Sequence, residues 1–431
     1  MRYSIPKGLF DIVPEEPKAE NAWRCSHRWQ YLEDQIHKLA QDFGFSEIRT
    51  PIFERTELFV RGVGESSDIV SKEMYTFDDK ADRSMSLRPE GTAPVIRSFI
   101  ENGLHQLGSL QKFYYVGPFF RYDRPQAGRY RQFHQFGVEA IGNGTPDQDV
   151  EIIAMLHELF TRLGLKEWTL LLNSVGDSTC RESYRAALKD FLKPHFHALS
   201  DDSKMRFEKN PLRILDTKDK NERHLLQNAP SIHDFLSPKS KHHFDTVCQR
   251  LKALAIPYTL QPSLVRGLDY YNETVFEFTS SSLGAQNSTS GGGRYDGLIS
   301  ELGGPDLPST GFSVGMERLL ITMEAQNCPF PKPPTPFIYF VPLGENAYSK
   351  CFELTHLLRQ NRIPTDLAPA ARKVQKGIQQ AEKRLASYVI VLGDDELQND
   401  RIQLKHLETR KETAIATCDL LQLARQLYAN S

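Results

Sequence analysis

A proline-rich segment divides the chain into two unequal parts. Residues 329–336 contain five prolines in eight positions. Proline fixes φ and lacks a backbone N–H donor, so neither a helix nor a central strand can form there, and the segment predicts a stiff linker. It leaves about 328 residues before it and 95 after it. The total length of 431 residues fits two or three domains.

The overall composition is that of a folded, nearly neutral protein. Hydrophobic residues make up 39% of the chain and charged residues 25%, and the formal net charge is -2. Disorder needs low hydrophobicity with high net charge, and non-specific binding to DNA or to an anionic membrane needs a strongly basic surface. The composition argues against both, although it leaves room for a local basic site.

The chain shows no signal for export or for membrane insertion. No apolar run approaches the length of a bilayer span, and residues 1–8 lack the apolar core and cleavage site of a signal peptide. We therefore expect a cytoplasmic protein with no membrane and no DNA partner.

The cysteines and paired histidines do not form a recognisable metal or disulfide pattern. The six cysteines lie far apart and include no Cys-x-x-Cys pair, which favours buried reduced thiols. The pairs His195/His197 and His242/His243 have no thiolate or suitably spaced acidic partner. We interpret them as helix-surface residues and assign no metal to protein ligands.

The segment after the linker alternates strand and helix patterns. An apolar run at 337–341 precedes a helical stretch at 345–360, and a second apolar run at 388–392 ends at Gly393. This alternation predicts a small α/β domain over 337–431.

The segment before the linker predicts an α+β domain over 1–328 with a helical insertion. A helical pattern from about 22 to 43 ends at Gly44. Strand-like segments follow, and the sequence from about 178 to 257 then becomes charged and helical. The expected strands are 47–51, 84–87, 113–121, 133–141, 258–260 and 273–279.

The densest cluster of functional side chains lies between residues 117 and 139. Two predicted strands flank a loop, and four arginines and one aspartate lie between Arg121 and Arg131. Arginine suits planar phosphate recognition, whereas a solvated basic hairpin is the structural alternative. Aromatic residues between the arginines favour the first interpretation. Gly137, on the face shared by Gln135 and Glu139, predicts room for a flat ligand on the sheet.

Three further clusters carry polar or glycine-rich turns. In 87–92, Glu90 and Thr92 join a strand to a helix, where they could hold an ammonium group or simply cap the helix. In 265–271, Gly267 indicates a tight backbone, and Arg266 precedes two tyrosines that could wall a polar aromatic ligand. The glycine run at 291–293 allows close approach to a ligand, although such runs more often form plain flexible loops, and it does not fit a P-loop.

A fifth cluster matches a hydrolase pattern. Gly311-Phe312-Ser313-Val314-Gly315 fits G-x-S-x-G, with Asp366 and His406 following in the hydrolase order. A serine hydrolase is therefore one hypothesis. The other is a strand-to-helix turn that delivers Arg318 to a ligand.

Taken in order, these clusters resemble those of the histidyl-tRNA synthetases, bacterial type, within the class II aminoacyl-tRNA synthetases. Residues 45–51 resemble motif 1, Phe120–Phe133 motif 2 and Gly311–Leu319 motif 3. The segments 265–271 and 292–297 resemble those specific to the histidine enzyme, and 337–431 resembles its α/β anticodon-binding domain. The resemblance implies a class II catalytic domain, an antiparallel sheet with flanking helices, that carries the helical insertion.

The resemblance also implies an ATP site made largely of arginines. Arg121 would bind the α-phosphate of ATP and the substrate carboxylate, and Arg129 would hold the outer phosphates. Phe133 and Arg318 would sandwich adenine. Arg266 would be the distinctive catalytic cation beside the α-phosphate, so Arg266 and Arg121 are the predicted catalytic residues.

Two sets of side chains would hold histidine. The set for its amino-acid end is Glu90, Gly91, Thr92 and Gln135. The set for its imidazole is Glu139, Tyr270 and Tyr271, because a carboxylate and phenols can satisfy a ring that carries a donor and an acceptor.

The implied reaction is that of a histidine–tRNA ligase. It would use L-histidine, ATP with Mg²⁺, and tRNA(His), whose acceptor end would meet Arg124 and Gln126, and motif 1 would build a homodimer. A non-catalytic synthetase paralogue is the main alternative, although such regulatory subunits lack the tail and tend to lose the catalytic arginine. Asp123 departs from the class, which usually has Glu there.

Overall fold

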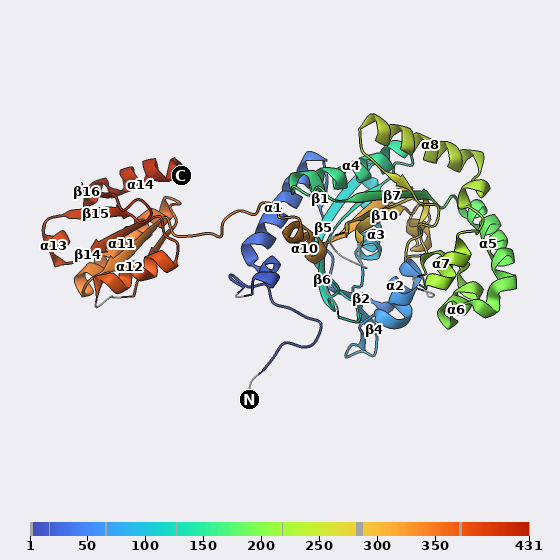
Figure 1. The fold of residues 1–431 in the computed structure, drawn as a ribbon, viewed down its shortest axis with the longest axis horizontal. Helices are drawn as coiled ribbons and strands as arrows, with labels where there is room; N and C mark the ends of the chain where they lie inside the picture. The colour runs from blue at the N-terminus through green and yellow to red at the C-terminus, as the bar shows by residue number, and fades with distance from the viewer. Residues whose placement is uncertain are drawn as a thin grey trace. The chain divides into compact units, whose positions relative to one another are not determined.

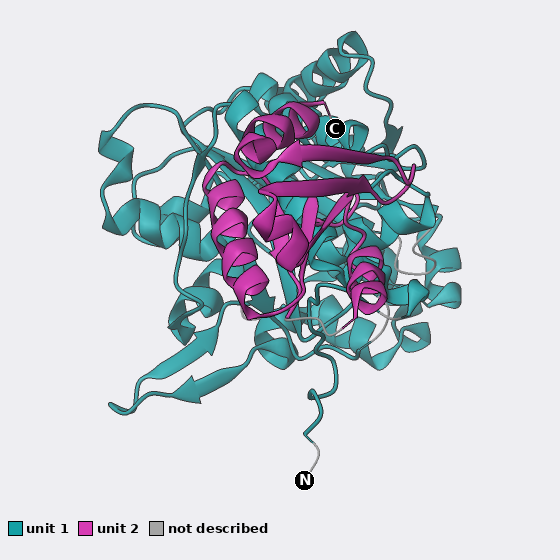
Figure 2. Ribbon diagram, turned by 90° about the vertical axis from the view of Figure 1, so that its left-hand side faces the viewer, with its two compact units in different colours: residues 1–331 teal, residues 332–431 magenta. Residues whose placement is uncertain are grey.

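The chain forms two compact units, Met1–Pro331 and Lys332–Ser431 (Figure 2). The structure, a computed structural model, describes residues 3–16, 18–64, 67–125, 128–217, 219–281, 288–369 and 373–430. Residues 329–336 contain neither helix nor strand, as their prolines predict. Phe330 packs on the first unit, with its ring centroid 6.2 Å from that of Tyr31.

An eight-stranded sheet forms the centre of the first unit (Figure 1). Its strands are β1 (Ser46–Glu47), β5 (Gln111–Phe120), β6 (Gln132–Ile141), β7 (Thr169–Ser174), β8 (Thr259–Leu260), β9 (Asn272–Thr279), β10 (Ser288–Arg294) and β11 (Ser309–Gly315). Their order is β1-β5-β6-β11-β10-β9-β7-β8. In this order, all neighbouring strands between β5 and β7 are antiparallel. At the two edges, β1 pairs with β5 and β8 pairs with β7 in parallel orientation.

Helices α1 (Ser26–Asp42), α4 (Pro146–Arg162) and α10 (Met316–Ala325) pack on one face of this sheet. In α1 the apolar side chains recur at helical spacing, and Leu32, Ile36 and Leu39 are fully buried. Gly44 follows the helix at φ +73°, a conformation that favours glycine and stops the helix. Alternate residues of β6, such as Phe136 and Val138, point into this core.

The opposite face of the sheet is only partly covered. Helices α2 (Thr56–Val63), α3 (Thr92–Glu101) and α9 (Leu298–Glu301) lie on this side, and a separate apolar cluster joins α3 and α9 to β5. The rest of this face is left for polar side chains.

A small sheet accompanies this region, with β2 (Phe53–Arg55), β3 (Thr76–Asp78) and β4 (Ser84–Leu87) in the order β2-β4-β3. The expected strand at 47–51 is wrong in its extent, because pairing stops at Glu47 and resumes at Phe53. Pro51 lies in the gap, where it needs no ladder donor.

The chain between β7 and β8 is helical. Its α-helices are α5 (Ser178–Leu192), α6 (Asp201–Lys209), α7 (Lys220–Leu226) and α8 (Pro238–Ala253), with 3-10 turns η4 (Lys193–Ala198), η5 (Pro211–Asp216) and η6 (Ile232–Phe235) between them (Figure 1). Side-chain caps from Asp177, Ser200, Asp219 and Ser237 start the four α-helices. Apolar residues from α5, η4, η5 and η6 form a core of their own.

The second unit is an α/β layer structure. Its sheet has the order β13-β12-β14-β15-β16, with β12 (Ile338–Pro342), β13 (Thr365–Leu367), β14 (Tyr388–Leu392), β15 (Arg401–His406) and β16 (Glu412–Ala416). Its helices are α11 (Glu345–Gln360), α12 (Val374–Lys383), α13 (Asp394–Gln398) and α14 (Leu420–Ala429). The predicted α+β class with a smaller α/β part is confirmed.

Neither a membrane span nor a metal cluster occurs in the described part of the chain. None of its helices combines the length and apolar character that crossing a bilayer requires. No group of three or more His, Cys, Asp or Glu residues there could hold a metal ion. All six cysteines are free, and four of them are buried.

Candidate active site

The partly covered face of the large sheet contains a cavity of about 510 Å³. Strands β5, β6, β9, β10 and β11, the start of α10 and the loop 265–271 contribute its walls. Most of the residues predicted for the site line this cavity. They are Glu90, Gly91, Thr92, Arg121, Arg129, Phe133, Gln135, Arg266, Tyr270, Tyr271 and Arg318.

Strand register explains which residues face the cavity. A single cross-strand row runs over β5, β6, β11, β10 and β9 through Tyr115, Gly137, Ser313, Gly291 and Glu277. Residues of opposite parity on these strands enter the apolar core on the other face. The sheet therefore presents small, polar and aromatic groups to one side of a rigid platform.

Tyr115 occupies the space that Gly137 leaves open. A Cβ added at Gly137, or at Gly91, would collide with the Tyr115 ring. The prediction that Gly137 leaves room for a flat ligand is therefore wrong, because a side chain of the neighbouring strand fills that room. Tyr115 was not predicted as a site residue, yet it lines the cavity.

Glu139 is buried directly behind the cavity wall and is 1% exposed. Thr92 Oγ1 donates to its carboxylate at 2.8 Å and Tyr115 OH at 3.4 Å, and Tyr295 OH also donates to it. Burial raises the pKa of Glu139 to about 8. Gly311 is required beside it, because a Cβ there would strike the Glu139 carboxylate. The arrangement is a carboxyl group surrounded by hydroxyls, at the end of the cavity where Tyr270 also lies.

Glu90 caps α3, as the structural alternative predicts, and also lines the cavity. Its carboxylate accepts the backbone N–H groups of Thr92 at 2.7 Å and Ala93 at 2.8 Å. Burial raises the pKa of Glu90, while these two amides oppose the rise. Tyr270 OH donates to Thr92 Oγ1 at 3.5 Å, which links the helix start to the loop 265–271.

The motif 2 arginines divide between the cavity and its rim. Arg121 donates through Nε to Pro89 O at 2.8 Å, and its guanidinium carbon lies 5.2 Å from the centroid of the Phe133 ring. Burial lowers the pKa of Arg121. Arg129 pairs with Asp123 at 3.1 Å. Arg124 is exposed and does not line the cavity, and Gln126 lies outside the described residues.

Arg318 is fixed at the start of α10. It donates through Nε to Gly128 O at 2.9 Å and through Nη1 to Ser288 O at 2.6 Å. Its neighbour Glu317, which the sequence analysis did not single out, accepts from the backbone N–H of His134 at 2.8 Å and contacts His134 Nδ1 at 2.9 Å. The motif 3 helix is thereby tied to the motif 2 strand.

Arg266 forms an ion pair inside the cavity. Its Nη1 lies 2.5 Å from Glu277 Oε2 on β9. A Cβ at Gly291 would collide with the Arg266 guanidinium, so the glycine run of β10 provides room for this side chain rather than for a flexible loop. Gly267 has no atom near its would-be Cβ and shows no positive φ, so its expected tight backbone is wrong.

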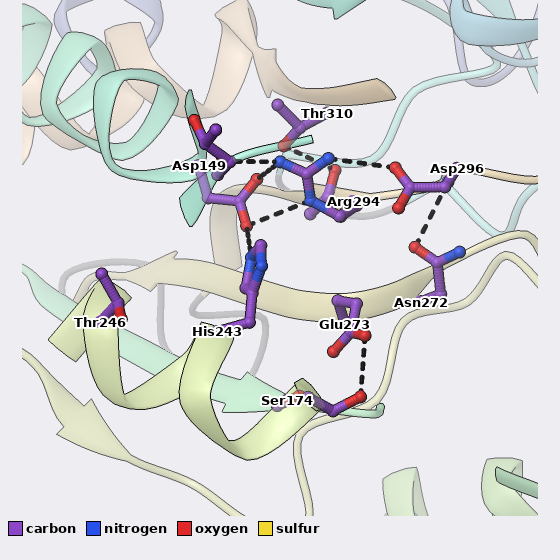
Figure 3. A network of polar contacts seen from close by, with 12 residues as sticks. Asp149, Ser174, His243, Thr246, Asn272, Glu273, Arg294, Asp296 and Thr310 are labelled. Carbon is purple, nitrogen blue, oxygen red and sulfur yellow. Dashed lines mark hydrogen bonds and ion pairs between the residues drawn. The ribbon is translucent and has the colours of Figure 1, made fainter. Parts of the chain in front are cut away.

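A buried ionic network supports the segment that carries Tyr295 (Figure 3). Arg294 Nη2 lies 2.6 Å from Asp149 Oδ1, and Arg294 Nη1 lies 3.1 Å from Asp296 Oδ1. Asp149 also contacts His243 Nε2 at 2.7 Å. Burial opposes ionisation of Asp149, but Arg294 and His243 outweigh it and hold the pKa of Asp149 below its usual value. The interpretation of His243 as a surface residue is therefore wrong.

Ser313 does not occupy a nucleophile elbow. It lies inside β11, paired with Gly291 on one side and Gly137 on the other. An elbow needs the serine at the turn between strand and helix. Asp366 and His406 belong to the second unit. The serine-hydrolase hypothesis has no structural support in this arrangement.

Four cavity-region residues were missed by sequence reasoning, namely Tyr115, Glu277, Tyr295 and Glu317. Tyr295 lies within the segment 292–297, which resembles the histidine enzyme, and Glu317 directly precedes the predicted residue Arg318. Tyr115 and Glu277 could have been found only from register, since each lies opposite a glycine that faces the site.

Comparisons with known proteins agree with this geometry. The family model for histidyl-tRNA synthetase matches residues 23–319, and the anticodon-binding-domain model matches residues 338–427. A histidine–tRNA ligase of Protochlamydia amoebophila is 54% identical over 420 residues, covering 97% of this chain and 99% of the relative. A histidine–tRNA ligase of a Geobacillus species is 47% identical, covering 96% of this chain and 97% of the relative.

A solved structure gives the same result for the fold. The crystal structure of apo Staphylococcus aureus histidyl-tRNA synthetase superposes with a TM-score of 0.83 at 38% identity, covering 98% of this chain and 99% of that one. The matches extend over both units and include the cavity. The chain belongs to the histidyl-tRNA synthetase family of class II aminoacyl-tRNA synthetases.

Proposed function

We propose that this protein is a histidine–tRNA ligase. It activates L-histidine with ATP to give histidyl-adenylate and pyrophosphate, and it then transfers histidine to the 3′ end of tRNA(His). One observation carries the proposal: a single cavity joins a carboxyl-and-hydroxyl pocket, around Glu139, to a group of arginines suited to a triphosphate.

The arginines define the ATP end of the cavity. Arg121 binds the α-phosphate and the histidine carboxylate, and Arg129 binds the outer phosphates. Phe133 and Arg318 hold adenine between an aromatic ring and a guanidinium plane. Arg266 is the catalytic cation at the α-phosphate, and Glu277 aims its guanidinium. Support comes from the common cavity and from the match of the family model across all of these positions.

The other end of the cavity binds histidine. Its α-amino group is held by Glu90, by Gln135 and by the segment Gly91-Thr92. The Gln135 Oε1 atom is buried and has no hydrogen-bond partner among the described residues, which suits it to accept from an ammonium group. Glu139, Tyr270 and Tyr271 read the imidazole. An apolar side chain would leave these polar groups unpaired and would be rejected.

Activation needs positioning and charge neutralisation rather than a protein nucleophile. The histidine carboxylate oxygen attacks the α-phosphorus of ATP, and the bond from that phosphorus to the pyrophosphate oxygen breaks. Arg121 and Arg266 neutralise the charge that develops on the α-phosphoryl oxygens. Glu277 and Asp123 line the same cavity, but each is paired with an arginine, so we assign no Mg²⁺ ligand to the protein, and Mg²⁺ would enter on the nucleotide phosphates. Mg²⁺ would supply further neutralisation of those phosphates.

The transfer step involves the tRNA. The terminal ribose 3′-OH attacks the activated carbonyl and releases AMP. The acceptor end contacts Arg124 and Gln126, and the second unit, which matches an anticodon-binding domain, binds the anticodon. We place the catalytic domain at 1–328, the linker at 329–336 and the anticodon-binding domain at 337–431. The protein acts in the cytoplasm as a homodimer.

The non-catalytic paralogue is disfavoured by what the chain retains. Arg266 lies inside the cavity, and the anticodon-binding model matches 338–427. The decisive experiment is histidine-dependent exchange between ATP and labelled pyrophosphate, followed by histidylation of tRNA(His) transcripts. Both activities are expected, and folded protein that supports neither would overturn the proposal.

A further inference from the structure

We infer that Arg213, in the helical segment between β7 and β8, is a positioning residue for histidine activation. It fixes the loop that carries Arg266, Tyr270 and Tyr271. This inference rests on the function proposed above and adds a residue from outside the recognised motifs.

The loop has no secondary structure to hold it. Residues 261–271 lie outside all helices and strands of the described chain, between β8 and β9. Its backbone must therefore be held by other groups if the side chains of Arg266, Tyr270 and Tyr271 are to keep one geometry, since a binding group displaced by about 1 Å can lose much of its effect.

Arg213 holds the middle of this loop at two points. Its Nη2 donates to Gly267 O at 3.0 Å, the carbonyl of the residue directly after Arg266. Its Nε and Nη2 donate to Asp269 Oδ1 at 3.1 Å and 3.0 Å, one residue before Tyr270. The planar, forked guanidinium suits simultaneous binding of this carbonyl and this carboxylate.

The surroundings of Arg213 make this contact rigid. Arg213 is 9% exposed in η5, a turn that packs into the separate core of the helical segment. Asn210 Nδ2 also donates to Asp269 Oδ1, at 2.8 Å. On its other side Asp269 lies against α2, since its backbone N–H donates to Val63 O at 3.5 Å.

Two further side chains, one from the helical segment and one from β7, hold the ends of the loop. Arg181 of α5 donates to Tyr271 O at 3.0 Å. At the other end, Asn173 of β7 donates to Leu264 O at 2.9 Å, and its Oδ1 contacts His233 Nε2 of η6 at 2.8 Å. The helical segment thus holds the loop at Gly267, Asp269 and Tyr271, and Arg213 holds it nearest to Arg266. Histidine activation is thereby coupled to the placement of that segment.

The side chains proposed for adenine and for the outer phosphates do not depend on this contact. Arg129 and Phe133 lie on the motif 2 hairpin, where they contact Asp123 and Arg121, and Arg318 lies on α10 and donates to Gly128 O. Loss of Arg213 should therefore weaken histidine binding and slow exchange, while the KM for ATP stays the same.

The test uses the full chain and steady-state ATP–pyrophosphate exchange. Arg213→Met should raise the KM for histidine about tenfold or more and lower kcat, with the KM for ATP within about twofold of wild type. The KM for histidine of Arg213→Lys should lie between those of the wild type and Arg213→Met, because lysine keeps the positive charge but lacks the planar, forked donor group. The double variant Arg213→Met/Asp269→Asn should raise the KM for histidine little more than Asp269→Asn alone does, because the two residues act through the same contact.

Arg250→Met is the matched control. Arg250 of α8 pairs with Asp147 at 2.8 Å, but both side chains are more than half exposed and neither contacts the loop. Its kinetics should equal those of wild type. Should Arg213→Met not fold, Arg213→Lys and Asp269→Asn make the same comparison.

The outcomes separate this inference from the proposed function. Wild-type protein without histidine-dependent exchange would refute the proposed function. Normal wild-type exchange combined with unchanged kinetics in Arg213→Met would refute the inference alone. An equal rise in the KM values for histidine and ATP would also refute it, because it would show a general loss of structure.

Discussion

Removing one partner of the buried pair Arg294–Asp149 should strongly destabilise the first unit. Both side chains are 1% exposed. Replacing Arg294 by Met leaves the Asp149 carboxylate in the interior with His243 as its remaining recorded ionic contact. Removing one partner of a buried pair costs about 3–5 kcal/mol, since the other charge stays desolvated and uncompensated.

Tryptophan fluorescence measures this effect in the full chain. All three tryptophans, Trp23, Trp29 and Trp168, belong to the first unit. Their signal in a urea titration therefore reports that unit without interference from the second. With an m-value of about 3 kcal/mol/M, a loss of about 4 kcal/mol lowers the midpoint by about 1.3 M.

Two comparisons make the result specific. The double variant Arg294→Met/Asp149→Leu should lose less free energy of unfolding than the sum of the two single variants, because it buries no unpaired charge. Arg250→Met, which breaks an exposed pair, should cost less than about 1 kcal/mol. A midpoint for Arg294→Met within about 0.3 M of wild type would refute the reasoning, as would strict additivity.

Four further outcomes follow from the site. Arg266→Ala should cut ATP–pyrophosphate exchange by on the order of 100-fold while histidine still protects the protein from thermal unfolding, and an unchanged rate would remove Arg266 from the mechanism. Ser313→Ala should change exchange by less than about threefold, and inactivation of a folded variant would revive the hydrolase hypothesis. Burial raises the pKa of Glu139 to about 8, so its protonated form stabilises the fold fully below about pH 4.5, and this stability is lost as the pH rises through about 8. Relative to Glu139→Gln, the ligand-free wild type should lose up to about 1.4 kcal/mol per pH unit over that range in urea titrations, and parallel pH profiles would contradict this. Finally, residues 1–331 alone should exchange pyrophosphate but histidylate tRNA poorly, and full charging by this fragment would refute the role of the second unit.

Local patterns predicted most of the fold. The strand at 84–87 and the helix at 345–360 have the predicted bounds, because periodicity and breaker residues determine them. The segment 47–51 was mispredicted because a strand can leave one sheet and enter another without any change in composition. The insertion was visible as a change in residue type, but its side-chain contacts to the loop 261–271 were not.

The residue types of the site were predictable, but their neighbours were not. Arg121 and Arg318 belong to motifs that can be recognised in a single sequence. The partners that fix them lie far away in sequence, as with Pro89 for Arg121 and Gly128 for Arg318. A glycine that faces a site, such as Gly137, indicates that another group comes close. Only the strand register shows that the group is Tyr115.

The most direct test of the account is the amino-acid dependence of ATP–pyrophosphate exchange. Purified full-length protein should be assayed with each of the twenty amino acids at equal concentration. The account predicts exchange with histidine that exceeds the rate with any other amino acid by on the order of 10³ or more, because the pocket around Glu139 leaves polar groups unpaired with other side chains. Exchange with another amino acid at a comparable rate, or no exchange with histidine in folded protein, would contradict it.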